Sequence, residues 1–235
     1  MINLGVARLT VGTDGEQSKV TDQFSQTPLQ LHRPLYLDEQ NFPTVYLKSP
    51  SSGLLGNDSH AIDVSVSANS TLELRTQAAT LVYPGRSSLN VKLQVAERGR
   101  LIYLPHPIIL GAAASLEQRV SIDLGEDATL EYSDTWCVGR IAMAEVWKFQ
   151  TYDYALEIFQ AGRLLFRERW ILEPGRMPVQ HPLLCGDYTH FAAYYSFGRA
   201  ASGDISPDCS SFESGLDWTM RRGANTIRRR AYKVS

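Results

Sequence analysis

The sequence has few cysteines, no long apolar run and little net charge, and each absence excludes a class of protein. Three scattered cysteines in 235 residues, Cys137, Cys185 and Cys209, form no CxxC pair, which argues against a disulfide framework and favours a reducing compartment. No stretch approaches the roughly 20 apolar residues that span a bilayer, and no signal-peptide pattern opens the chain. A net charge of −2 is not that of a general nucleic-acid binder. We therefore expect a cytoplasmic protein with no membrane or nucleic-acid partner.

The motifs of familiar enzymes are also missing. The sequence contains no GxSxG, P-loop, HExxH or dinucleotide-binding fingerprint, and its five histidines form no local metal motif. Nothing in the residue pattern therefore points to catalysis, and we expect a protein that is not an enzyme.

Apolar and polar residues alternate along the middle of the chain, with the period of two that is typical of half-buried strands. A segment made of a turn and a strand recurs along the chain. Its copies are residues 67–74, 96–103 and 125–132, spaced 29 residues apart, and residues 160–166 form a looser copy. Stacking of such units buries a continuous core. The pattern predicts an all-β fold of mostly antiparallel strand–turn–strand layers, stacked in a helical or sandwich-like way into a single domain of residues 1–235.

Helices are expected to be few, one or two short ones, with a candidate in residues 212–231 despite two interrupting glycines. Six basic residues and no acid lie in residues 221–235, whereas the rest of the chain is acidic. We interpret this segment as a basic C-terminal tail that is solvated or bound to a partner protein. An RNA-binding arm is a weaker alternative, because so few charges give weak and salt-sensitive affinity.

Carboxylates interrupt the apolar faces of three predicted strands. One face of residues 130–138, 141–149 and 164–172 is apolar except for Asp134, Glu145 and Glu168, respectively. An ionised carboxylate in an apolar interior costs several kcal/mol unless it is paired or hydrated.

Two interpretations of these acids stay open. Each acid can pair with an arginine, such as Arg140 or Arg169, or accept hydrogen bonds from backbone amides. Three acids on successive strands also suit a polar passage for a hydrated divalent cation. Two carboxylates would likewise serve a glycosidase, so a β-rich carbohydrate-active enzyme is the alternative function.

Several segments, in this order over residues 29–174, resemble the urease accessory proteins called UreD or UreH. They are residues 31–36 (LHRPLY), 45–47 (VYL), 53–58 (GLLGND), 76–83 (TQAATLVY), 101–105 (LIYLP), 139–140 (GR) and 168–170 (ERW). The resemblance implies a urease maturation factor, a non-catalytic scaffold with a helically stacked all-β fold. It would bind apo-urease and recruit a helical accessory protein of the UreF type, which brings a nickel-delivering GTPase of the UreG type.

The resemblance also implies that Ni2+ passes transiently through the interior of the fold, with no tightly bound cofactor. The positions that match the family's acids are Asp58, at the end of the glycine turn, Asp134 and Glu168. Glu145 matches the family's acid after the Gly-Arg pair. These four residues are the candidate metal contacts.

The sequence departs from the family's usual pattern at four positions. Ser52 and Asn57 each stand where a second glycine is usual, Leu81 where a lysine is usual, and His106 where a glutamine is usual. Leu81 in place of the lysine removes a cation and changes the local field.

Overall fold

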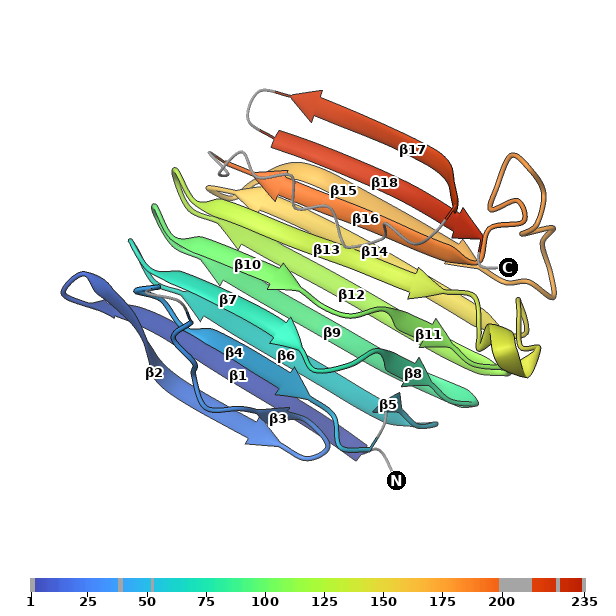
Figure 1. Ribbon diagram of the computed structural model, residues 1–235, viewed down its shortest axis with the longest axis horizontal. Helices are drawn as coiled ribbons and strands as arrows, with labels where there is room; N and C mark the ends of the chain where they lie inside the picture. Colours follow the sequence, from blue (N-terminus) through green and yellow to red (C-terminus); the bar gives the residue numbers. More distant parts are fainter. Residues whose placement is uncertain (1–2, 38–39, 52, 199–212, 223–224, 234–235) are drawn as a thin grey trace.

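The computed structural model describes residues 3–37, 40–51, 53–198, 213–222 and 225–233, and nearly all of its regular structure is strand. The strands form two facing sheets (Figure 1). Sheet A has the order β15 (Arg163–Leu172), β14 (Thr151–Gln160), β12 (Ala114–Leu124), β9 (Gly85–Val95), β6 (Asp58–Val66), β1 (Asn3–Asp14) and β2 (Gln17–Gln26). Sheet B has the order β17 (Glu213–Arg222), β18 (Asn225–Lys233), β16 (His190–Phe197), β13 (Thr129–Cys137), β10 (Arg100–Leu104), β7 (Thr71–Thr76), β4 (Thr44–Lys48) and β3 (Gln30–Leu31).

Three short strands complete sheet B beside this main path. They are β5 (Gly53–Leu54), β8 (Thr80–Val82) and β11 (Ile108–Leu110). Strand β8 pairs with both β5 and β11, and β11 also pairs with the end of β13. The expected all-β fold is confirmed.

The 29-residue repeat is one coil of the stack. A coil runs along a long strand of sheet A, turns a corner, and returns along two short strands of sheet B. In sheet A, Ile62 pairs with Val91 and Val91 with Val120, each 29 residues further on. In sheet B, Leu72, Leu101 and Leu130 pair in the same way.

The predicted antiparallel pairing is wrong for these central strands, which are parallel. Each corner carries the chain from one sheet to the other, so consecutive strands do not pair with each other. The neighbour of each strand is instead the equivalent strand of the next coil, which runs in the same direction. Antiparallel pairs occur toward the ends of the stack, as in β1–β2, β14–β15 and β13–β16–β18–β17.

The corners are tight turns that repeat with the same period. Their third residues, Asn69, Arg98 and Asp127, have positive φ values of 58°, 54° and 52°. Asparagine and aspartate tolerate this left-handed backbone better than most residues with a side chain. Backbone hydrogen bonds tie successive corners together, since Ala96 N donates to Val66 O at 2.8 Å and Gly125 N donates to Val95 O at 2.7 Å.

The core lies between the two sheets and is filled by the inward side chains of both. Aliphatic residues fill the end nearest the corners, and aromatic rings fill the part bounded by β13, β14, β15 and β16. In this aromatic part Tyr132 stacks with Tyr103 and Tyr195, with ring centroids 5.9 and 5.6 Å apart, and Trp136 stacks on Phe191 at 4.2 Å.

Three local expectations need correction. Residues 213–222 and 225–233 form strands rather than a helix. Residues 225–233 of the basic segment therefore form no tail outside the fold, because β18 pairs with β16 in sheet B. The segment after Gly139 is not a strand but the 3-10 helix η1 (Ile141–Met143) followed by turns, and η1 is the one helix among the described residues.

The cysteines and the membrane prediction can be checked only on the described residues. Cys137 and Cys185 are free and buried, and Cys209 lies outside the part that the structure describes. No helix in that part is long and apolar enough to cross a membrane.

Candidate functional site

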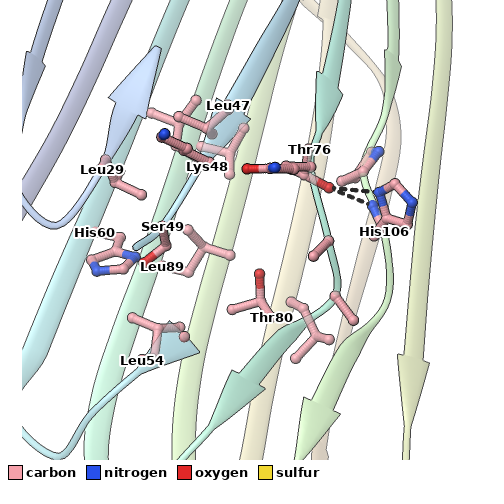
Figure 2. A pocket seen from close by; sticks show the side chains of 18 of the residues that line it. Leu29, Leu47, Lys48, Ser49, Leu54, His60, Thr76, Thr80, Leu89 and His106 are labelled. Atoms are coloured by element: carbon pink, nitrogen blue, oxygen red, sulfur yellow. Dashed lines mark hydrogen bonds between the residues drawn. The ribbon is translucent and has the colours of Figure 1, made fainter. Parts of the chain in front are cut away.

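A cavity of about 340 Å3, called cavity 1 below, lies between the sheets where sheet B is interrupted. Breaks in three neighbouring coils line up there, namely the breaks between β4 and β5, between β7 and β8, and between β10 and β11. Ser49, Ala78 and His106 from these breaks line the cavity, and His60 and Leu89 line it from sheet A. Figure 2 labels Ser49, His60, Leu89 and His106. The repeat thus builds an opening in sheet B by placing the same break in each coil.

A second cavity of about 380 Å3, called cavity 2 below, lies where the aromatic core meets the C-terminal strands. It is lined by Glu168 and Trp170 of β15, Tyr195 of β16 and Arg229 of β18. Cys185, in the segment between β15 and β16, also lines it. Burial raises the pKa of the Cys185 thiol to about 11, so this thiol stays protonated at neutral pH.

Of the residues that the structure describes, Asp134 alone lines both cavities. It lies on the inward face of β13, between Tyr132 and Trp136, and is only 6% exposed. Burial raises its pKa to about 6, while the Tyr154 hydroxyl, the Gln118 amide and the charge of Arg229 limit the rise. Most Asp134 carboxyls are therefore ionised at pH 7, which places a negative charge in the lining of both cavities.

Tyrosine hydroxyls surround this charge. Tyr132, Tyr152, Tyr154 and Tyr195 are buried, and burial raises the pKa of each one far above its usual range, with the charge of Asp134 acting in the same direction. These hydroxyls stay protonated and can serve as hydrogen-bond donors. The lining around Asp134 is thus polar but carries no mobile proton near neutral pH.

Glu168 joins the two sheets. Its carboxylate forms an ion pair with Arg229, accepts a hydrogen bond from the Tyr195 hydroxyl at 2.9 Å, and accepts another from Trp170 Nε1 at 3.0 Å. The arginine partner expected for the acids, Arg169, pairs with Asp153 instead, at 2.8 Å. Glu168 therefore faces cavity 2 with its charge already compensated.

The carboxylates of Asp58 and Glu145 accept hydrogen bonds within local turns. Asp58 is buried at the start of β6, and its Oδ2 atom accepts a hydrogen bond from the backbone N–H of Leu55 at 3.0 Å. Glu145 accepts a hydrogen bond from Arg140 Nε at 2.7 Å, as one of the expected pairings predicts. The Arg140 guanidinium lowers the pKa of Glu145.

The structure thus brings two of the four candidate acids to the cavities. Asp134 and Glu168 both line cavity 2, whereas Asp58 and Glu145 are not among the described lining residues of either cavity. No three His, Cys, Asp or Glu side chains in the described part of the chain gather closely enough to hold a metal ion.

Sequence reasoning missed two residues of this site, His60 and Arg229. His60 follows Asp58 on the same inward face of β6, so the alternation that singled out the acids also predicts its orientation. The run of basic residues predicts a tail around Arg229, and no local pattern shows that its strand lies in sheet B beside β16.

Comparison with known proteins shows the family. Residues 4–229 match the family of UreD urease accessory proteins. The chain belongs to the UreD family of urease accessory proteins. It is 37% identical to the urease accessory protein UreD 2 of Synechococcus sp. (strain JA-3-3Ab) over 187 residues, which are 77% of this chain and 68% of that relative.

Other relatives carry the same name. A Synechococcus sp. (strain JA-2-3B'a(2-13)) UreD is 38% identical over 67% of this chain and 57% of the relative. The urease accessory protein UreH of Helicobacter hepaticus is 29% identical over 73% of this chain and 68% of the relative. Membership confirms the resemblance and supports a role in urease maturation. An accessory-protein family also favours a non-catalytic role over a carbohydrate-active enzyme.

The departures from the UreD pattern fit the local structure. Asn57 has a φ of 71°, a left-handed conformation that asparagine tolerates, so its backbone matches what a glycine would provide there. Leu81 pairs with Gly53 between β8 and β5. The backbone N–H of His106 donates a hydrogen bond to Thr76 Oγ1 at 2.7 Å, at the break between β10 and β11. Ser52 lies outside the described residues.

Proposed function

We propose that this UreD-family chain is a non-catalytic, cytoplasmic scaffold whose interior passes Ni2+ toward apo-urease through two cavities that meet at Asp134. Its partners in this proposal are apo-urease, a helical accessory protein of the UreF type and a nickel-delivering GTPase of the UreG type. Family membership supports the accessory role, and the position of Asp134 in the lining of both cavities is the single observation that carries the route.

A passage for Ni2+ needs weak, repeated oxygen contacts, since a tight site would retain the ion rather than release it. Asp134 suits such a contact because its carboxylate lies among neutral tyrosine hydroxyls, while the ion pair of Arg229 is with Glu168. Nickel should therefore be transient cargo, and purified protein should retain little of it.

Glu168 has a different place in the proposed route. A cation that enters cavity 2 meets a carboxylate already bound to Arg229, so contact with Glu168 requires that this ion pair loosen. Asp134 is accordingly the first nickel contact and Glu168 the second. Contacts of Ni2+ with Asp58 and Glu145 stay predictions, because the carboxylates of both residues are engaged in turns.

The test uses a urease operon in a heterologous host whose own copy of this gene is deleted and replaced by the present chain, with cognate partners supplied. The Asp134→Asn variant should lower nickel-dependent ammonia release while the accessory complex still co-purifies. Glu131→Gln is the matched control, because Glu131 is a buried acid of the same strand that pairs with Arg100 on the opposite face, away from both cavities.

Normal activation by Asp134→Asn would contradict the interior route. An equal loss of activation in Glu131→Gln, with both variants soluble, would show that any buried acid of β13 matters for structural reasons. Turnover of glycosides by the purified chain would instead support the carbohydrate-active alternative.

A further inference from the structure

His60 is a buried histidine in the wall of cavity 1 that the proposed route does not yet use. It is 2% exposed and lies on β6 opposite Leu89 of β9. Its ring nitrogen Nε2 is buried and has no hydrogen-bond partner among the described residues. Buried polar atoms are almost always paired, so an orphan nitrogen at the wall of a cavity points to a missing ligand.

A buried imidazole nitrogen without a hydrogen-bond partner suits metal binding. A neutral imidazole carries one nitrogen lone pair, which is the form that binds metal ions. The cavity of about 340 Å3 beside it has room for a partly hydrated cation.

The neighbouring strand leaves space for this ring. A Cβ atom on Gly5 of β1 would lie 2.8 Å from His60 Cδ2 and 3.2 Å from His60 Nε2. Any side chain at position 5 would therefore push the imidazole from its place. Gly5 thus leaves room for the imidazole ring of His60, and the Nε2 atom of that ring has no hydrogen-bond partner among the described residues.

We propose that His60 Nε2 is a nitrogen ligand for Ni2+ in cavity 1 and makes the route selective for Ni2+ over Mg2+. This inference rests on the proposed function and adds the selectivity that a route of carboxylates lacks. Mg2+ prefers oxygen ligands and keeps its waters, whereas imidazole suits Ni2+ and similar transition metals. One weak nitrogen contact is enough to favour entry of Ni2+ without trapping it.

The test measures Ni2+ and Mg2+ binding to the purified full chain by equilibrium dialysis, with Ni2+ alone and in excess Mg2+. His60→Leu should weaken Ni2+ binding about tenfold or more and leave Mg2+ binding unchanged. His106→Asn is the matched control, since His106 also lines cavity 1 but is exposed and has Thr76 Oγ1 at 3.2 Å from its Nδ1. This control should bind Ni2+ as the unaltered chain does.

Two further measurements separate ligation from a structural role. In chain labelled with 15N-histidine, Ni2+ should broaden the His60 signals at lower metal concentration than those of the other histidines. His60→Leu should melt no lower than the unaltered chain, because it removes an unpaired polar atom and keeps an apolar side chain in the core. Unchanged Ni2+ binding by His60→Leu, or an equal loss of Mg2+ binding, would overturn the inference.

Failure of this inference differs from failure of the proposed function. If Asp134→Asn blocks urease activation while His60→Leu binds Ni2+ normally, the route stands and the His60 ligand is refuted. If His60→Leu loses Ni2+ binding while Asp134→Asn activates urease normally, the ligand is supported and the route through Asp134 is refuted.

Discussion

Replacing Glu168 with glutamine tests how much the ion pair between the two sheets contributes to stability. Glu168 lies on β15 of sheet A and Arg229 on β18 of sheet B, with side chains 10% and 30% exposed. The variant removes the negative charge of Glu168 from the ion pair with the half-buried Arg229 guanidinium. Glutamine still offers an oxygen to Tyr195 or Trp170, so the change concerns mainly the charge.

The structure sets the size of the effect. Removal of one partner from a buried ion pair costs about 3–5 kcal/mol, and the partial exposure of Arg229 reduces this to about 2–3 kcal/mol. For a chain of this length, that loss lowers the melting temperature by about 5–10 °C. Thermal and urea unfolding of Glu168→Gln against the unaltered chain measure both quantities.

A second substitution separates the ion pair from other effects. Arg229→Met removes the positive charge of the pair and keeps a long apolar side chain. The double variant should therefore be more stable than the sum of the single effects predicts, by about 1–2 kcal/mol. A Glu168→Gln protein that melts within about 1 °C of the unaltered chain would refute the reasoning, as would strictly additive effects. The result also decides whether any loss of urease activation in this variant reflects lost stability or a lost nickel contact.

Three further predictions concern single positions. The pKa of Asp134 is raised from 3.8 to about 6, so the folded chain holds the proton of this carboxyl more tightly than the unfolded chain does. The free energy of unfolding should therefore fall by about 3 kcal/mol as the pH rises from about 4 to 6 and Asp134 loses its proton. Asp134→Asn should remove this pH-dependent loss, as urea unfolding at several pH values would show; an unchanged slope would contradict the assigned pKa. Ala161→Asn should stabilise the chain by about 0.5–1 kcal/mol, because residues 161 and 162 both have positive φ in the β14–β15 hairpin, where Asn-Gly is preferred, and a lower melting temperature would count against it. Gly139→Ala should destabilise the chain by more than about 2 kcal/mol, because φ is 144° and the added Cβ would overlap the carbonyl oxygen of Glu145; normal melting would show that the turn adapts.

The sequence predicts the stack of coils but not the direction of its strands. The 29-residue spacing and the alternation of apolar residues correctly place Leu72, Leu101 and Leu130 in register. A tight turn between two strands, however, looks the same in sequence whether it closes a hairpin or rounds the corner of a coil. The distinction depends on which strand lies across the hydrogen bonds, and that is a contact between residues far apart in the chain.

The same limit applies to the site. Alternation correctly places Asp134 and Glu168 on inward faces, because this depends only on the local strand. It fails for Glu145, where Gly139 with a φ of 144° ends the strand and begins a turn. The partner of Glu168 lies 61 residues away on β18, and no local pattern identifies it.

The constant register of the coils limits how this chain can change in length during evolution. One residue inserted within β9 or β12 would turn every following side chain of that strand from the core to the solvent. A duplicated 29-residue coil would keep all faces as they are and only lengthen the stack. Single insertions and deletions should therefore fall in the segments between strands, where they leave the inward and outward faces of the long strands unchanged.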